Sequence, residues 1–317
     1  MYLQQFTEHF PIYVECMKAT DHNSPYHIEG SVWTHTCMVY SAIKMFRPDS
    51  KVLLIAAILH DIGKVKTKTL NAKGNHSFSG HEGVSTFLAT DILPLWDLTT
   101  TEKQQILTLI SLHGVCSSQI SIPYLTMFRA ADITGRICSN PKGQSDYEPR
   151  KFRTPSDSPK YTVTMLVGLP CSGKSTYAAT LGLPIISRDD FLMSNFGEPG
   201  ESYNKVYTDV HNDFLLRQSL DSGFNAHLQA AAKAKSDLVI DMTMLSLSSR
   251  RSMMIQFQHA KFKAIVFLPR LSTIEARNQA RTGKFISDEV YFNMMKSFVM
   301  PVREEGFESI SIILENS

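Results

Sequence analysis

Apolar residues recur at helical spacing along the first 140 residues of the chain. Short polar segments, some with Pro or Gly, separate the periodic stretches, so each stretch predicts an amphipathic helix. The expected helices are Ser31–Met45, Lys51–Ile62, Gly83–Ile92, Thr101–Leu112 and Tyr124–Ile137. The pattern predicts an all-α domain over residues 1–140.

The pattern changes in the second half of the chain. Pro141–Lys160 contains four prolines and almost no apolar residues, which is typical of a linker. Beyond it, short β-branched runs alternate with helical stretches, and this alternation predicts parallel strands with crossover helices. The expected strands are Thr162–Val167, Pro184–Ile186, Asp237–Ile240 and Lys263–Leu268. We therefore predict a multidomain chain: an all-α fold, a linker over residues 141–160, and an α/β fold with a parallel sheet over residues 161–317.

Composition adds a few limits. The net charge is only +2, and both halves are nearly neutral, so any polynucleotide contact must be a local patch. Eight of the 11 histidines precede Ser158, which indicates different chemistry in the two halves. Five cysteines without a CxxC pair predict free thiols in a reducing compartment. With no signal peptide and no apolar run of about 20 residues, we expect a cytoplasmic protein without membrane contact. The oligomeric state stays open.

One glycine-rich segment has a recognisable chemistry. GLPCSGKST fits G-x-x-x-x-G-K-[ST], follows a predicted strand and opens a predicted helix. In such a loop, backbone N–H groups surround phosphate oxygens, the lysine reaches the β/γ-phosphates and the next hydroxyl binds Mg²⁺. The motif predicts binding of ATP, or another nucleoside triphosphate, with Mg²⁺ by Gly168, Cys171, Ser172, Gly173, Lys174, Ser175 and Thr176.

The phosphoryl acceptor must be read from residues beyond this loop. The second strand runs into Arg188-Asp189-Asp190, and a carboxylate at a strand's carboxyl end faces the ligand crevice of an open α/β fold. We interpret Asp189 as the base that accepts the proton of the attacking hydroxyl, and Asp190 as a helix cap. Arg188 either binds an acceptor phosphate or pairs with Asp190. Asp241 ends another strand and could lie near Mg²⁺ or the acceptor.

Two arginines follow at helical spacing. Arg277 and Arg281 are four residues apart in RNQARTGK, so they share one helix face. A lid could place such an arginine over the γ-phosphate, where it stabilises transition-state charge; a solvated helix face is the alternative.

Together these pieces resemble the 5′-kinase domain of phage-type polynucleotide kinase over residues 161 to about 300. The matching segments are GLPCSGKST, SRDD, the acid-ending strand and RNQARTGK. The resemblance implies Asp189 as general base, Arg281 as lid arginine, and Asp241 as a residue that holds the acceptor. One position departs from the family, which has a phosphate-binding arginine three residues after the base, where this chain has Leu192.

The N-terminal half contains a second constellation. A His-Asp pair that ends a strongly apolar helix costs several kcal/mol, roughly, unless it is satisfied. A divalent metal would satisfy it, and imidazole with carboxylate suits Mn, Fe, Ni, Co or Zn. Such a metal supplies hydroxide near neutral pH. The predicted ligands are His35, His60, Asp61 and Asp132, with Asp61 also counted as catalytic.

This order, H…HD…D, resembles the HD phosphohydrolase superfamily over residues 28–140. VWTH, ILHDIGK, SGHEG, SLHG and AADITGR look most like the HD domains attached to tRNA nucleotidyltransferases. The resemblance implies second-metal or phosphate ligands at His81 and His113, with hydrogen bonding near the site as the alternative. Lys64 either contacts substrate phosphate or is a surface lysine. His22, His27 and His76 lie in polar loop-like stretches and receive no role.

The combination resembles the HD–polynucleotide kinase enzymes of bacteria and phages, which heal nucleic-acid ends. The implied activity is ATP-dependent phosphorylation of 5′-hydroxyl ends together with removal of a 3′-, 2′- or 2′,3′-cyclic phosphate, on RNA rather than DNA. Such chemistry leaves room for functional coupling to an RNA ligase. Two alternatives stay open: a nucleoside or small-molecule kinase fused to a nucleotide phosphohydrolase, and an ATP-gated regulatory module that binds nucleic acid.

Overall fold

The structure is a computed structural model that describes residues 1–23, 27–72, 74–115, 120–137 and 161–314. The chain divides into two compact units, Met1–Lys151 with Phe292–Met300, and Phe152–Tyr291 with Pro301–Ser317. The linker predicted at residues 141–160 lies outside the described residues, and the domain limits expected from the sequence remain a prediction.

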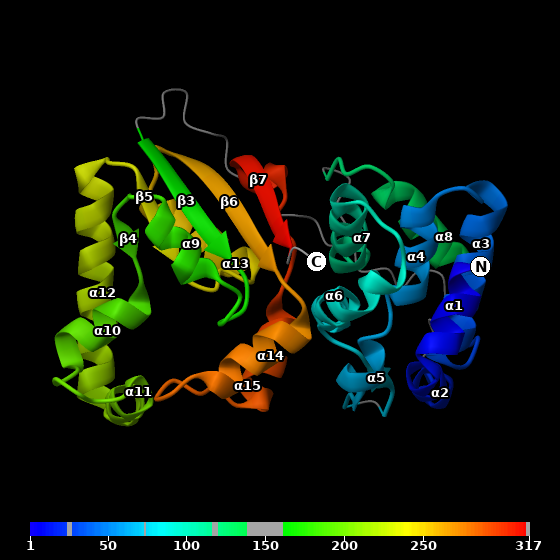
Figure 1. Cartoon of the computed structure of the whole chain (residues 1–317), viewed down its shortest axis with the longest axis horizontal. Coiled ribbons are helices and arrows are strands. Elements are labelled where there is room, and N and C mark those ends of the chain that lie inside the picture. Colours follow the sequence, from blue (N-terminus) through cyan, green and yellow to red (C-terminus); the bar gives the residue numbers. More distant parts are fainter. Residues whose placement is uncertain (24–26, 73, 116–119, 138–160, 315–317) are drawn as a thin grey trace. The chain divides into compact units, whose positions relative to one another are not determined.

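The first unit is helical, as expected (Figure 1). The five predicted helices are present with ends shifted by a few residues, and the sequence analysis missed α1, α2, α5 and a short antiparallel hairpin. The elements are α1 (Tyr2–His9), α2 (Pro11–Ala19), α3 (Val32–Phe46), α4 (Lys51–Leu59), α5 (Lys64–Thr67), β1 (Thr69–Leu70), β2 (His76–Ser77), α6 (His81–Ile92), η1 (Leu93–Leu95), α7 (Thr100–Leu112) and α8 (Leu125–Thr134).

The centre of this unit is α4. Every residue from Val52 to Leu59 is buried, and a helix that is apolar on all sides is stable only inside a core. Helices α1, α3, α7 and α8 pack around it. Ser50 starts the helix by accepting a hydrogen bond from Leu53 N (3.3 Å). The helix ends at Leu59 inside the core, and the next two residues, His60 and Asp61, are therefore also buried.

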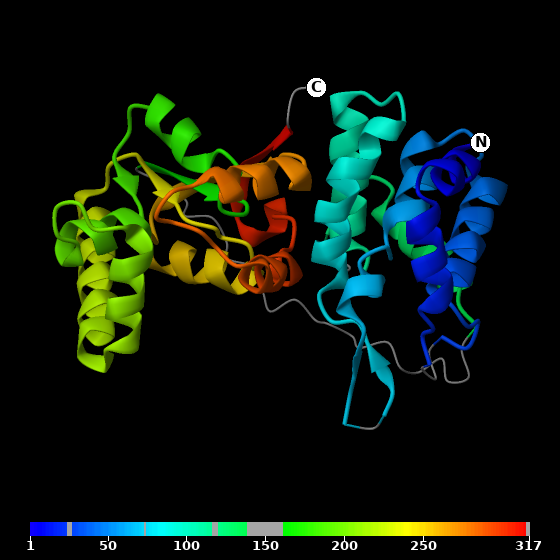
Figure 2. The same ribbon diagram turned by 60° about the horizontal axis from the view of Figure 1, so that its bottom comes forward.

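The second unit contains a parallel sheet with strand order β4-β5-β3-β6-β7. The sequence predicted four of these strands and missed β7. The elements from residue 161 onward are β3 (Tyr161–Val167), α9 (Lys174–Thr180), β4 (Ile185–Ile186), α10 (Arg188–Phe196), α11 (Tyr203–Asn212), α12 (Phe214–Ala234), β5 (Leu238–Asp241), α13 (Leu247–Gln256), β6 (Ala260–Leu268), α14 (Leu271–Ala280), α15 (Asp288–Ser297), η2 (Arg303–Glu305) and β7 (Phe307–Leu314). Residues 292–297 of α15 belong to the first unit. Figures 1 and 2 together show α9 and α13 on opposite faces of this sheet.

Strand order brings three candidate residues to one edge of the sheet. The β3 strand ends at Val167, immediately before the glycine-rich loop, and Asp241 ends β5 opposite Leu166. The neighbouring β4 ends at Ile186, three residues before Asp189. Because parallel strands all end at the same edge of a sheet, the glycine-rich loop, Asp189 and Asp241 lie on the same side of the crevice at that edge.

None of the described helices is long and apolar enough to cross a membrane. Cys16, Cys37 and Cys171 are free thiols, as expected from the sequence.

A buried ion pair fixes α13 in the second unit. Arg250 is fully buried and Glu305 is 5 % exposed. The guanidinium donates Nε–H to Oε2 and Nη2–H to Oε1, both at 2.7 Å, and Nη1 donates to the carbonyls of Met244 and Leu245. Four of the five N–H donors of the guanidinium are therefore paired with these acceptors.

Removing one partner should leave an unpaired buried charge. We expect Glu305→Ala to lower the unfolding free energy of the second unit by about 3–5 kcal/mol, measured by urea unfolding of the whole chain. Glu308→Ala, which breaks the exposed pair with Lys261 (3.1 Å), is the matched control and should change it little. Equal effects of both substitutions would contradict this account.

Candidate functional site

Four predicted ligands meet inside the first unit. His35, His60, Asp61 and Asp132 are each at most 3 % exposed. His35 Nε2 lies 2.9 Å from Asp132 Oδ1 and 3.4 Å from His60 Nε2, and His60 Nε2 lies 3.2 Å from Asp61 Oδ2. Residues from α3, from the end of α4 and from α8 thus converge on one point, as the sequence predicted.

The orientation of the histidine rings suits the binding of a metal ion. Each of four histidines directs Nδ1 to a backbone carbonyl, so Nδ1 donates its proton there and Nε2 is the nitrogen that faces the cluster and would bind a metal. The pairs are His35 with Gly135 (3.0 Å), His60 with Ala57 (2.9 Å), His81 with Phe78 (2.9 Å) and His113 with Ile110 (2.7 Å).

Asp61 lies between two groups of these nitrogens. Its Oδ2 faces the Nε2 atoms of His60 (3.2 Å) and His35 (3.6 Å), while Oδ1 faces those of His81 (3.2 Å) and His113 (3.6 Å). Buried Oδ1 has no well-directed hydrogen bond among the described residues. The nitrogen–oxygen donor set around this carboxylate suits a divalent ion such as Mn, Fe, Co, Ni or Zn. A second metal or a phosphate at His81 and His113 remains a prediction.

The charges of the cluster keep its carboxylates ionised. Burial alone would raise the pKa of Asp61, but the charges of His60 and Lys64 hold it well below its usual value. The pKa of Asp132 is likewise well below its usual value, because the hydrogen bond with His35 and the charge of Arg136 outweigh burial. Burial also lowers the pKa of His35, yet hydrogen bonds with Asp132 and Glu29 raise it to about 9, so a metal would replace the proton on its Nε2. Both carboxylates are thus in the form that binds cations.

Lys64 is part of this buried network. It is 6 % exposed, its ammonium donates to Asp61 Oδ2 (2.7 Å), and His22 Nε2 lies 3.2 Å away. The alternative that Lys64 is a surface lysine is therefore wrong. Contact between Lys64 and a substrate phosphate remains a prediction.

The glycine-rich loop has the backbone that its motif requires. Gly168 and Gly173 have φ angles of +153° and +100°, in the region that favours glycine, and a Cβ at Gly168 would approach Phe267 O to 2.8 Å. Lys174 is buried and donates to the carbonyls of Gly168 (3.0 Å) and Leu169 (2.7 Å). Ser175 is exposed at the start of α9, so its hydroxyl is accessible to a ligand.

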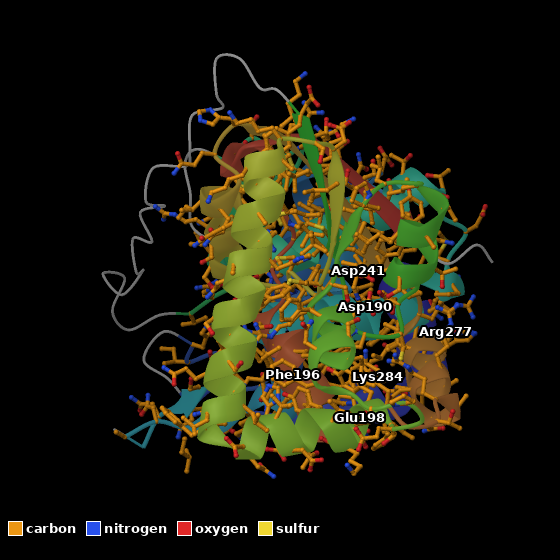
Figure 3. All side chains as sticks on the ribbon, turned by 90° about the vertical axis from the view of Figure 1, so that its left-hand side faces the viewer. Asp190, Phe196, Glu198, Asp241, Arg277 and Lys284 are labelled. Carbon is orange, nitrogen blue, oxygen red and sulfur yellow. The ribbon has the colours of Figure 1, made fainter. Side chains whose placement is uncertain are left out.

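Asp189 lies beside this loop with two polar partners. Its side chain is 50 % exposed; Tyr203 Oη donates to Oδ1 (2.8 Å) and the Lys284 ammonium to Oδ2. The same ammonium lies 3.9 Å from the centre of the Tyr203 ring. Burial and the Asp189 charge raise the pKa of Tyr203, so its hydroxyl stays a donor. Figure 3 shows Lys284 in the same region as Asp190, Asp241 and Arg277.

Three details of this region correct or complete the sequence interpretation. Ser187, not Asp190, caps α10, because Ser187 Oγ accepts from Asp190 N (3.1 Å). Arg188 pairs with Asp221 on α12 rather than with Asp190. Leu192 is 2 % exposed in a core with residues of α11 and α12, so it faces away from the acceptor side.

Both arginines of the predicted lid reach the loop. Arg277 Nη1 donates to Cys171 O (3.2 Å), and Arg281 Nη1 lies 3.3 Å from Cys171 Sγ. Tyr291 Oη donates to Pro170 O (3.2 Å). Arg277 is exposed and Arg281 is partly buried, so the solvated-face alternative stays open for Arg277, and the role of Arg281 remains a prediction.

Sequence reasoning gave no role to Tyr203 and Lys284. Lys284 stood in the motif RNQARTGK, whereas no sequence signal pointed to Tyr203. Both were hidden because their contacts with Asp189 join residues 14 and 95 positions apart.

Comparison with known proteins identifies both halves. Residues 32–134 match the family model of the HD domain, and residues 163–301 match that of an AAA domain. The chain therefore joins a helical HD domain to a P-loop kinase-like α/β domain, which confirms the expected fold classes and their order.

Several solved structures are similar to part of this chain. A sugar kinase from Janibacter sp. is 17% identical over 49% of this chain and 85% of its own, with a TM-score of 0.34. Kti12 from Chaetomium thermophilum is 15% identical over 49% and 89%, with a TM-score of 0.34. The Pnkp1/Rnl/Hen1 complex is 21% identical over 43% of this chain and 44% of its own chain, with a TM-score of 0.31.

The buried lysine of the loop predicts how ATP affinity depends on pH. Burial lowers the pKa of Lys174 to about 8, against the attraction of Asp241 and Asp189. Above that pH the free protein holds a neutral lysine, so ATP affinity should fall between pH 7 and 9.5, approaching tenfold per pH unit. Calorimetric titration with ATP measures this, and Lys174→Ala should bind weakly with little pH dependence. A flat wild-type profile up to pH 9.5 would refute the assignment.

The position of Asp61 between two groups of imidazole nitrogens predicts the metal content of variants. Asp61→Asn should lose metal from both groups of nitrogens, because one neutral amide oxygen replaces two anionic ones. After equilibration with Mn²⁺ or Ni²⁺ and gel filtration, elemental analysis counts the bound ions per chain. Asp97→Asn changes an exposed carboxylate of the same unit and is the control. Equal metal content in both variants would rule out the proposed centre.

Proposed function

We propose that this chain heals broken RNA ends by phosphorylating the 5′-hydroxyl and removing the phosphate from the 3′ side. The observation that supports it best is the presence of opposite phosphate chemistries in one chain. One unit holds a P-loop with an accessible carboxylate beside it; the other holds a buried cluster of imidazoles and carboxylates. Cleavage of RNA commonly leaves a 2′,3′-cyclic phosphate or 3′-phosphate and a 5′-hydroxyl, so a single RNA break offers a substrate to each chemistry.

In the kinase reaction, Asp189 accepts the proton of the attacking 5′-hydroxyl. Its partial exposure lets an acceptor approach, and Tyr203 holds one carboxylate oxygen in place. The acceptor hydroxyl must share the other oxygen with Lys284, whose ammonium can then face an acceptor phosphate. Lys174 and Ser175 bind ATP and Mg²⁺, and Arg281 stabilises charge on the transferred phosphoryl group.

In the phosphatase reaction, the nitrogen and oxygen donors around Asp61 would hold the divalent metal. When bound, such a metal lowers the pKa of a water ligand and polarises the phosphate. Lys64 keeps Asp61 oriented through its ion pair (2.7 Å). We propose that the same ammonium attracts the substrate phosphate. His81 is the least buried of the four histidines and marks the side from which a phosphate enters.

One observation favours a second candidate function. Leu192 is buried at the position where a polynucleotide-type kinase would have a phosphate-binding arginine. A nucleoside or another small hydroxyl compound has no such phosphate and would not need one. In that case the chain would be a small-molecule kinase fused to a nucleotide phosphohydrolase.

The test follows both ends of one substrate. An RNA oligonucleotide with a 5′-hydroxyl and a 3′-phosphate is given ATP and Mg²⁺, then Mn²⁺ or Ni²⁺. We expect Asp189→Asn to reduce 5′-phosphorylation by about 10²–10⁴-fold and to spare phosphate release, whereas His60→Ala should do the opposite.

Competition decides the acceptor class. Excess unlabelled oligonucleotide should suppress transfer of the labelled phosphate, whereas free nucleoside should not; the reverse result would support the small-molecule kinase. The DNA oligonucleotide of the same sequence tests the preference for RNA. ATP hydrolysis without any phosphorylated acceptor would contradict both readings and indicate a regulatory module.

A further inference from the structure

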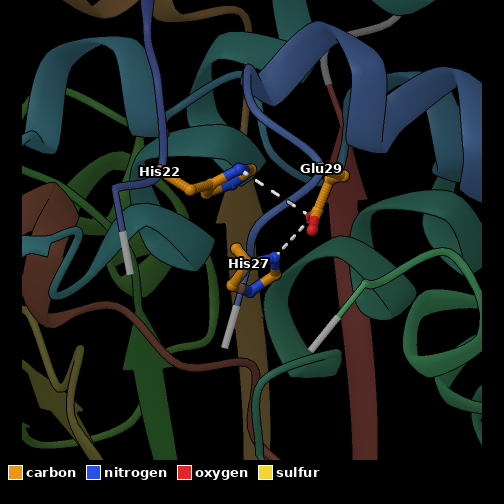
Figure 4. Close-up of side chains that lie close together, drawn as sticks. All are labelled: His22, His27 and Glu29. Atoms are coloured by element: carbon orange, nitrogen blue, oxygen red, sulfur yellow. Dashed lines mark hydrogen bonds and ion pairs between the residues drawn. The ribbon is translucent and has the colours of Figure 1, made fainter. Parts of the chain in front are cut away.

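The loop before α3 contains a second cluster of titratable side chains. Asp21 and Ser31 form an isolated antiparallel bridge that closes the loop, and His22, His27 and Glu29 point toward one another inside it (Figure 4). The side chains of His22 and Glu29 are at most 1 % exposed. None of these three residues has a role in the two reactions proposed above.

Glu29 binds the histidine that holds the metal. Its Oε1 accepts from His27 Nδ1 (2.7 Å) and faces His35 Nδ1 (3.2 Å), and its Oε2 accepts from Ile137 N (3.2 Å). The Nδ1–H of His35 is therefore shared between Glu29 and Gly135 O (3.0 Å). A carboxylate on the rear nitrogen of a metal-binding histidine fixes the ring and raises its basicity.

The other histidine of the loop reaches a second ligand. His22 Nε2 accepts from the Lys64 ammonium (3.2 Å), and Lys64 donates to Asp61 Oδ2 (2.7 Å). The His22 and His27 rings stack with centroids 4.3 Å apart and planes 19° apart, so each histidine supports the other. The loop therefore contacts His35 directly, through Glu29, and contacts Asp61 indirectly, because His22 binds Lys64 and Lys64 binds Asp61.

The same geometry argues against a third metal ion between these three residues. A metal lies in the plane of each imidazole that binds it, and the planes of two rings stacked 4.3 Å apart and inclined by 19° do not meet near their nitrogens. His22 accepts from an ammonium through Nε2, so its proton is on Nδ1, the nitrogen that faces Glu29 Oε1 at 3.9 Å. That nitrogen has no lone pair to offer a cation.

We infer that Glu29 is the positioning residue of the metal centre. His27 holds Glu29 in place, and His22 holds Lys64 in place. The inference rests on the metal centre of the proposed phosphatase, yet it concerns binding rather than turnover. Glu29 orients His35 and, through Ile137, ties down the segment that follows Asp132. Two ligands of one centre thereby depend on a single carboxylate outside it.

Metal affinity of the whole chain tests this inference. We expect Glu29→Gln to weaken binding of Mn²⁺ by about 10–100-fold, measured by competition with a chelator. Glu29→Asp should recover part of the loss, since it restores the anion at a shorter reach. With Co²⁺, the visible absorption bands of the bound ion should change in Glu29→Gln, because His35 is no longer held in one orientation.

Glu15→Gln is the matched control, because Glu15 lies on α2 of the same unit and pairs only with exposed Lys18 (2.8 Å) among the described residues. Circular dichroism and thermal unfolding without metal report the fold of each variant. Lower thermal stability with unchanged Mn²⁺ affinity and Co²⁺ bands would overturn the inference and leave Glu29 a merely structural residue. A wild-type chain that binds neither ion would instead overturn the metal centre itself.

Discussion

The burial of Asp61 is the constraint on which the helical unit depends. An ionised carboxylate that is 1 % exposed costs several kcal/mol, roughly, unless positive charge and hydrogen-bond donors surround it. The fold supplies Lys64 on one oxygen and imidazoles on both. Those imidazoles must in turn be held by their rear nitrogens, which explains why each points Nδ1 at a backbone carbonyl. The apolar helix α4 is the rigid support that places Asp61 at the centre.

The P-loop unit follows a different rule, because its central carboxylate is half exposed. Asp189 needs no metal for stability; one lysine and one tyrosine hydroxyl satisfy it. Such partners are easily exchanged for a substrate hydroxyl, whereas the partners of Asp61 are fixed within a packed core. The contrast matches the two proposed chemistries, because a base must release its partner to act, whereas a metal ligand must keep its position.

Much of this arrangement is visible in the sequence. Helical periodicity located α3, α4, α6, α7 and α8, since their buried faces are long and regular, and the glycine-rich motif located the nucleotide loop. The H…HD…D order indicated the ligands that meet around Asp61. The sequence could not show long-range contacts. Glu29 contacts Ile137, which lies 108 positions away, and β7 is an edge strand that pairs only with β6 among the described strands. The histidines at 22 and 27 looked like loop residues because nothing local shows that their loop is folded inward.

Leu192 bears on how the proposed acceptor would be recognised. Its side chain completes a core with Val206, Val210 and Leu220, so restoring an arginine there would bury a charge among apolar groups. A cation is nevertheless present on the acceptor side, because Lys284 reaches Asp189 from the segment after α14. In the proposed reaction, this positive charge would come from the segment that follows α14 and not from α10, the helix of Asp189. An acceptor phosphate bound there would contact a residue 95 positions from the base, and acceptor recognition would then depend on the same segment as the lid.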